Sequence, residues 1–227
     1  MKISFSETIF TAIILFAMAF TFSACSSADG GNQSDGSSIE YGGQKYRTVK
    51  IGTQTWMAEN LNYATEGSKC YDNDPANCNK YGRLYDWATA MSICPEGWRL
   101  PNNDDWDALY LYVDPSYDKN AQDGYRYSAI AGKYLKAKRG WDSYDGIANE
   151  DTYGFAALPG GSVSGCLLFG GGYSDECFRN LGSHGIWWSA SDDDDYAWYR
   201  YMSYDSNYAD LDVGSKIGYF ISVRCLQ

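Results

Sequence analysis

The chain has 227 residues, a formal net charge of −11 and an aromatic content of 17 %. Such an acidic chain argues against binding to nucleic acid, whose phosphates need a basic surface, and against electrostatic docking on anionic lipid. Without its first 24 residues the chain keeps about 200, enough for one domain with a substantial core.

The N-terminal segment has the features of a bacterial lipoprotein signal. Residues 9–22 are almost wholly apolar and are followed by Ser23-Ala24-Cys25. This apolar run has the length of a signal-peptide core and is shorter than the roughly 18 residues that a membrane-spanning helix needs. We expect residues 1–24 to be removed and Cys25 to carry lipid. A plain secretory signal and a retained membrane anchor are the alternatives.

This signal predicts where the protein works. A lipid on Cys25 would hold the chain on the bacterial cell envelope, at the outer membrane or the cell surface. Residues 26–38 are Gly, Ser, Asn, Asp and Gln with almost no apolar residue. Because such a segment cannot bury surface, we expect 25–40 to be a flexible tether and 41–227 to be one domain. Contact with the membrane is expected only through the lipid.

Six cysteines remain when Cys25 is set aside, and an even number in an exported chain indicates three disulfides. Sequence alone does not choose among the fifteen connectivities that six cysteines allow. Proximity along the chain favours two short loops and leaves one long one. The expected pairs are Cys70–Cys78, Cys166–Cys177 and Cys94–Cys225. A zinc site is the competing interpretation, but none of the six stands in a C-x-x-C pair.

The first half of the domain predicts a hairpin and two helices. Residues 46–51 and 55–58 read as strands joined by a short turn. Apolar residues recur at helical spacing over 84–93, and a second helix is expected after Asn103 as its N-cap. The aromatic residues Trp56, Trp87, Trp98 and Trp106 are expected in the core.

The second half is rich in glycine, aromatic and β-branched residues and predicts strands. The candidates are 185–190, 196–204, 208–213 and 218–225. Gly170-Gly171-Gly172 is expected to be a flexible loop within the Cys166–Cys177 bridge. Two helices followed by a loop-rich antiparallel sheet define an α+β domain.

Aromatic residues on the late strands are the candidate ligand-binding residues. Flat rings stack on sugar rings, although they can equally fill a small core. The candidates are Trp198, Tyr199, Tyr201, Tyr204 and Tyr208.

Carboxylates supply a candidate cation site. Asp192, Asp193, Asp194 and Asp195 could hold calcium weakly, or form a solvated loop. Asp72, Asn73, Asp74, Asn77 and Asn79, around the expected Cys70–Cys78 loop, offer a second set of oxygen ligands. No cofactor other than calcium is expected.

Several segments resemble the Fibrobacter succinogenes major paralogous domain. They are Tyr46–Leu61, Tyr81–Trp87, Cys94–Pro101, Gly154–Gly161, Trp187–Ser191 and Ser222–Cys225. The resemblance implies a C-type-lectin-like fold in a surface lipoprotein, with a disulfide between a helix cysteine and the last strand; Cys94 and Cys225 suit those roles. The calcium-binding triplets of sugar-binding lectins (Glu-Pro-Asn, Gln-Pro-Asp and Trp-Asn-Asp) do not occur in the sequence. Calcium-mediated sugar binding is therefore not implied.

The sequence gives little sign of an enzyme. His184 is the one histidine, and no nucleophile elbow accompanies it. Gly97–Pro101 also resembles a run in formylglycine-generating enzymes, but that chemistry needs reactive cysteines and here all six can pair. We expect a non-catalytic surface protein that binds polysaccharide. The alternatives are a structural or adhesion component that contacts envelope proteins and, less favoured, an envelope hydrolase.

Overall fold

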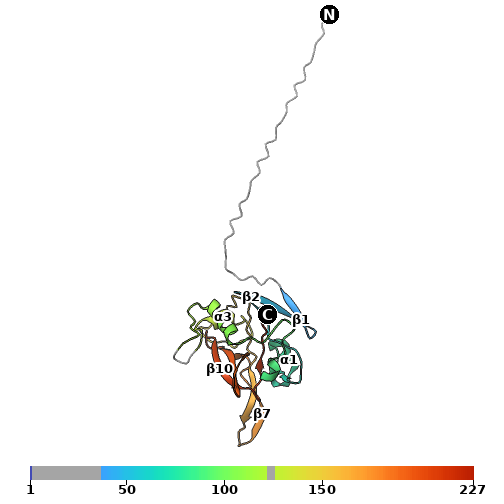
Figure 1. Cartoon of the computed structure of the whole chain (residues 1–227), viewed down its shortest axis with the longest axis vertical. Coiled ribbons are helices and arrows are strands. Elements are labelled where there is room, and N and C mark those ends of the chain that lie inside the picture. The colour runs from blue at the N-terminus through green and yellow to red at the C-terminus, as the bar shows by residue number, and fades with distance from the viewer. Residues whose placement is uncertain (2–36, 122–125) are drawn as a thin grey trace. The chain divides into compact units, whose positions relative to one another are not determined.

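The computed structural model describes Met1 together with residues 37–121 and 126–227. The helices and strands of this part belong to one unit, Gly31–Gln227 (Figure 1). The predicted signal peptide, Cys25 and most of the predicted tether lie outside the described residues. Within those residues, no helix is long and apolar enough to cross a membrane.

The domain opens with a three-stranded antiparallel sheet. The predicted hairpin is confirmed, with β2 (Gln44–Ile51) paired to β3 (Gln54–Met57). Gly52 takes a positive φ of 60° in the turn, which glycine adopts without strain. A further strand, β1 (Ser38–Tyr41), pairs with the other edge of β2. This strand lies largely within the segment 25–40 that was expected to be a tether.

A six-stranded sheet forms the centre of the domain, in the order β10-β9-β8-β11-β5-β4. Its strands are β4 (Ser68–Lys69), β5 (Leu84–Tyr85), β8 (His184–Asp193), β9 (Tyr196–Ser203), β10 (Asp210–Ser215) and β11 (Ile221–Ser222). All neighbours are antiparallel except β11 and β8, which pair in parallel at Ser222 and Trp187. A separate hairpin joins β6 (Ser162–Leu167) to β7 (Tyr173–Arg179) and projects from the body of the fold (Figure 1).

The longest helix in the described residues is α3 (Asn103–Val113), and its start is fixed by side chains. Asn102 accepts a hydrogen bond from the backbone N–H of Asp105, whose carboxylate accepts from the backbone N–H of Asn102. This capping box satisfies N–H groups that a helix start leaves unpaired. The predicted helix is confirmed, with its cap one residue earlier than expected. The other helical elements are η1 (Tyr71–Asn73), α1 (Pro75–Tyr81), α2 (Trp87–Ala90) and α4 (Ala131–Leu135).

The helix predicted over 84–93 is wrong in its first part and too long. Leu84 and Tyr85 instead form β5, between β4 and β11. Asp86 then caps α2 by accepting from the backbone N–H of Thr89. Helical spacing of the apolar residues is thus overridden by strand pairing, because both residues of β5 are buried in the sheet.

The core lies on both faces of the sheet. Trp187 and Trp188 are adjacent on β8 and fully buried, so they point to opposite faces. Trp187 packs in the cluster under α3, with Trp56, Trp106 and Phe155. Trp188 belongs to the second cluster, which contains Cys225. The predicted core positions Trp56 and Trp106 are confirmed.

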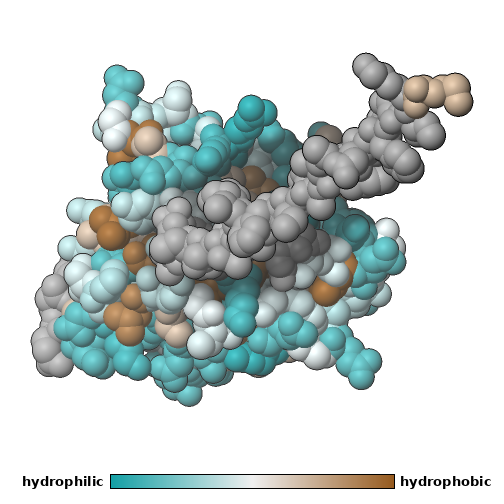
Figure 2. Space-filling view, turned by 90° about the horizontal axis from the view of Figure 1, so that it is seen from above, coloured by the Kyte–Doolittle hydropathy of each residue, from teal (hydrophilic) through white to brown (hydrophobic). Residues whose placement is uncertain are grey.

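The expected disulfides are all present. Cys70 is bonded to Cys78, Cys94 to Cys225 and Cys166 to Cys177. Cys94 lies in the turns after α2 rather than at a helix end, which corrects the expectation that it ends the first helix. The predicted α+β class is confirmed, whereas its more specific assignment as C-type-lectin-like stays a prediction. On the face seen in Figure 2, apolar residues lie in separate groups among hydrophilic ones.

Candidate functional site

The five aromatic residues predicted to bind ligand do not form one surface. Side chains alternate between the faces of a strand, so Trp198 lies on one face of β9 and Tyr199 and Tyr201 on the other. Tyr204 and Tyr208 lie beyond the end of β9. Of the five, Tyr199 and Tyr201 lie together on one face of β9, with their ring centres 6.3 Å apart.

The remaining three candidates have partners of their own. Trp198 packs against the guanidinium of Arg126, 5.6 Å from the ring centre. Tyr204 makes an edge contact with Tyr144 at 5.7 Å, and Tyr208 packs against Tyr127 at 4.9 Å. These are local contacts that lie apart from the pair on β9.

Tyr199 and Tyr201 are each paired with a carboxylate on β10. Tyr199 stands opposite Asp212 and Tyr201 opposite Asp210, and directly opposite residues in an antiparallel pair are neighbours. The two phenols donate to the carboxylates over 3.1 Å and 3.0 Å. Burial, with the nearby carboxylates, raises the pKa of Tyr201 to about 12. The Tyr201 phenol is therefore neutral at physiological pH, with its one proton donated to Asp210.

A groove of about 570 Å³ opens beside Tyr199, and the residues that line it do not include Tyr201. The hairpin supplies Tyr173 and Asp175, β9 supplies Tyr199, and the segment before β11 supplies Tyr219. The rings of Tyr199 and Tyr219 lie 5.8 Å apart, and Tyr173 is largely exposed. We call this site, with its three rings Tyr173, Tyr199 and Tyr219, the tyrosine groove.

Two glycines make room for the rings. A Cβ on Gly214 would stand 2.6 Å from the ring of Tyr219, and one on Gly165 would stand 1.9 Å from the hydroxyl oxygen of Tyr173. Both distances are shorter than a carbon contact allows, so any larger residue would displace these rings. The groove thus depends on glycine at these two positions as much as on its aromatic side chains.

The hairpin beside the groove contains the predicted glycine loop. Gly170-Gly171-Gly172 lies between β6 and β7, and Gly170 and Gly171 take positive φ. The two strands continue past the Cys166–Cys177 disulfide toward this loop. The disulfide therefore holds one wall of the groove in place.

The segment Asp192–Asp195 binds the ammonium group of a lysine side chain. Lys216 donates to a carboxylate oxygen of Asp192 over 2.6 Å and to the backbone carbonyl of Asp194. The same ammonium lies 4.7 Å from the centre of the Trp87 ring. Among the residues that the structure describes, no group of three or more His, Cys, Asp or Glu is placed to hold a metal.

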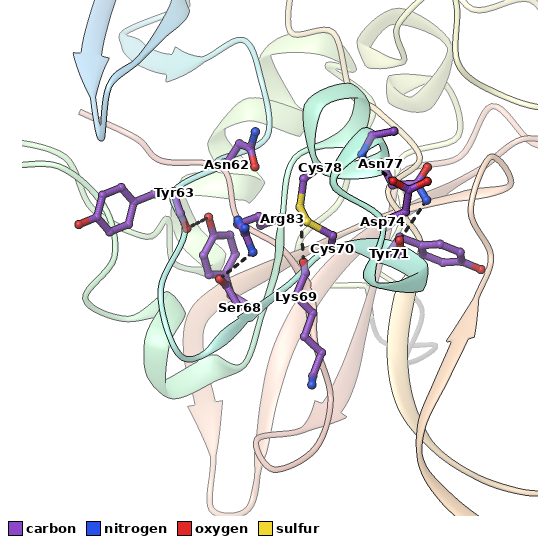
Figure 3. The surroundings of a disulfide bond; sticks show 12 residues. Asn62, Tyr63, Ser68, Lys69, Cys70, Tyr71, Asp74, Asn77, Cys78 and Arg83 are labelled. Atoms are coloured by element: carbon purple, nitrogen blue, oxygen red, sulfur yellow. Dashed lines mark hydrogen bonds between the residues drawn. A yellow bond between two sulfur atoms is a disulfide. The ribbon is translucent and has the colours of Figure 1, made fainter.

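The polar residues around the Cys70–Cys78 disulfide form hydrogen bonds that fix the local backbone (Figure 3). Asp74 caps α1 by accepting from the backbone N–H of Ala76, and Asn77 donates to the carbonyl of Tyr71. Asn73 donates to Glu176 on β7, over 3.0 Å. These contacts give the loop a structural role.

His184 lies at the start of β8, where its Nδ1 is 3.0 Å from the hydroxyl of Ser183. Burial lowers the pKa of His184, so the ring is neutral at physiological pH. Its hydroxyl partner is its neighbour in the chain, which makes this a local contact at a strand end.

Comparison with known protein families gives a match for this chain. Residues 49–227 match the Fibrobacter succinogenes major domain. The chain belongs to this family. Neither the curated proteins nor the solved structures contain a match. The whole tyrosine groove falls within the matched residues.

Tyr173 and Tyr219 are the groove residues that the sequence did not single out. Tyr173 begins β7, directly after the predicted glycine loop, and Tyr219 belongs to the strand predicted over 218–225 but stands before β11 in the structure. A signal was present in Gly165 and Gly214, but the space that they leave is visible only when the hairpin, β10 and the segment before β11 come together.

Proposed function

We propose that the protein is a non-catalytic, lipid-anchored surface protein whose domain binds polysaccharide in the tyrosine groove. The observation that carries this proposal is the groove itself, with three tyrosine rings at its walls and hydroxyl and carboxylate groups between them. Aromatic rings offer apolar faces to sugars, and the polar groups beside them can bond to sugar hydroxyls. Lipid on Cys25 would hold this domain on the outer membrane or the cell surface.

Retention on insoluble glycans tests the binding. The detergent-solubilised chain should be retained on a polysaccharide such as cellulose or xylan, and Tyr219→Ala or Tyr173→Ala should weaken retention by about threefold to tenfold each, as expected for the loss of one aromatic contact. Tyr208→Ala is the matched control because this exposed ring lies outside the groove. Equal loss in all three variants, or no retention on any glycan, would remove the proposal.

The anchor is tested separately. Metabolic labelling with a radioactive fatty acid should mark the wild-type chain and leave Cys25→Ser unlabelled. The wild type should fractionate with membranes after high-salt washing, because lipid rather than charge holds it there. A labelled Cys25→Ser chain would contradict the anchor.

A second function, adhesion to envelope proteins, is favoured by the hairpin tip. Leu167, Leu168 and Phe169 are exposed together beside the groove. Contiguous exposed apolar residues mark protein contact surfaces. Crosslinking from position 169 on intact cells, together with blank glycan arrays, would favour this function over polysaccharide binding.

A further inference from the structure

A second cleft, of about 530 Å³, lies on another part of the domain and shares no residue with the tyrosine groove. Five cationic side chains line it: Lys45, Arg47, Lys80, Lys138 and Arg139. They come from β2, from α1 and from the segment after α4. We call this site the cationic cleft.

The cationic cleft is positively charged, whereas the chain as a whole is negatively charged. Five of the 18 lysines and arginines stand around it, although the chain carries a net charge of −11. A cleft in which one sign of charge predominates concentrates the potential and attracts ligands of the opposite sign. On an otherwise acidic surface, such a cleft selects for anions.

Two carboxylates also line the cleft, and both are engaged by the protein. Glu59 accepts from the Arg47 guanidinium over 3.2 Å and from the Arg47 backbone N–H over 2.9 Å. Asp151 accepts from the backbone N–H of Ala156 over 2.8 Å, and burial raises its pKa. Glu59 and Arg47 thus neutralise one another, and the five cations and two carboxylates leave the lining with a formal net charge of +3.

A buried cation stands behind the cleft and adds to its positive potential. Arg224 is fully buried and donates to the side-chain oxygen of Asn60 over 2.7 Å and to the backbone carbonyl of Ala156 over 3.1 Å. Asn60 and Ala156 both line the cleft. The charge of Arg224 therefore acts from directly behind the cleft.

In the part of the chain that the structure describes, no carboxylate lies at ion-pair distance from the other cations of the cleft. Within residues 37–121 and 126–227, the ion pairs involve none of Lys45, Lys80, Lys138 and Arg139. All four are exposed. They are thus open to a ligand that carries several negative charges.

We propose that the cationic cleft binds an acidic saccharide. Its volume lies in the range of small-ligand sites, of about 300–1,000 Å³, and it is concave, whereas protein partners dock on broader surfaces. Cations on several sides of the cleft suit the repeated charges of an acidic glycan, and guanidinium groups bind carboxylates or sulfates through paired hydrogen bonds. That the ligand is a glycan rests on the proposed function; the preference for anions does not.

Calorimetry with short glycans tests the cleft in the detergent-solubilised full chain. Oligogalacturonate is the carboxylated probe, a heparin-derived oligosaccharide is the sulfated probe, and xylohexaose is the neutral probe. At least one acidic probe should bind, with an affinity that falls as salt is raised. Lys138→Gln/Arg139→Gln should weaken that binding at least tenfold. Lys119→Gln/Lys133→Gln removes the same charge elsewhere and should change it less than twofold.

The outcomes separate this site from the tyrosine groove. Tyr219→Ala should leave the binding of the acidic probe within twofold, and Lys138→Gln/Arg139→Gln should leave any retention on neutral glycan unchanged. No binding of either acidic probe overturns the cationic cleft while leaving the groove intact. Equal losses in the two double variants, or equally tight binding of polyglutamate, overturn it as well. Acidic binding without neutral binding keeps the cleft and removes the groove.

Discussion

Arg200 on β9 donates to Asp107 on α3 over 2.7 Å, with the two side chains 0 % and 4 % exposed. The hydroxyl of Tyr117 donates to the same carboxylate oxygen, and the guanidinium lies 5.2 Å from the centre of the Tyr110 ring. The ion pair therefore joins the main helix to the central sheet. A buried charge that keeps its partner is tolerated, whereas one that loses its partner is costly.

Asp107→Ala should lower the free energy of unfolding by about 3–5 kcal/mol, because it leaves Arg200 buried without a counter-charge. Urea denaturation followed by tryptophan fluorescence measures the change. The control is Asp104→Ala on the exposed side of the same helix, which should cost at most about 1 kcal/mol. Asp107→Leu/Arg200→Met should recover part of the loss. Equal effects at positions 104 and 107 would contradict the role of the pair.

The disulfides should differ in what they contribute to stability. Cys94–Cys225 closes a loop with a sequence separation of 131, and Cys70–Cys78 one of 8. In the chain-entropy account, the first bond contributes about 5 kcal/mol and the second about 2.5 kcal/mol. Replacing each pair with alanine and measuring unfolding in urea without reductant tests the order. A larger loss from the short loop would contradict it.

Local signals explain why some elements could be predicted and others not. The β2–β3 hairpin and α3 carry their own information, in a turn with Gly52 and in a cap at Asn102. β5 does not, because Leu84 and Tyr85 become a strand only when β4 and β11 flank them. Those partners are distant in the sequence or too short to recognise.

The same distinction explains which residues of the candidate site could be predicted. Tyr199 could be predicted because it is an aromatic residue within a segment whose strand pattern is visible in the sequence. Tyr219 could not, since its place in the groove depends on the space above Gly214. The cationic cleft was missed for a related reason: Lys45, Lys80 and Arg139 belong to three segments that only the folded chain brings together.

Gly214→Ala should weaken glycan binding without unfolding the domain. Its Cβ would stand 2.6 Å from the Tyr219 ring, which would have to leave its place beside Tyr199. The control is Gly172→Ala, where the nearest atom would be 3.8 Å away, in the side chain of Leu168. We expect a threefold to tenfold loss of retention for Gly214→Ala and none for Gly172→Ala, with both melting alike. Unchanged retention of Gly214→Ala would show that the placement of Tyr219 is unimportant.

Lys136 should make stability depend on pH between about 8 and 10.5. Its side chain is fully buried and donates to the carbonyls of Ser203 and Ser206 over 2.8 Å and 2.6 Å. Burial lowers its pKa from 10.5 to about 8. Above pH 8 the folded chain has released this proton while the unfolded chain still holds it. Stability from this group therefore rises with pH until the unfolded lysine also titrates.

Buried tyrosines have the opposite effect on stability as the pH rises. The contribution of Lys136 must therefore be measured as a difference between the wild type and a variant that lacks this lysine. Burial raises the pKa of Tyr117 and of Tyr201 to about 12, and these groups lower stability as the pH passes 10. Lys136→Met removes the lysine and keeps the tyrosines. The unfolding free energy of the wild type minus that of Lys136→Met should rise by about 2 kcal/mol from pH 7.5 to pH 9.5. A difference that stays constant would mean that Lys136 keeps its ordinary pKa, and that the two carbonyls and the Trp141 ring stabilise its charge inside the fold.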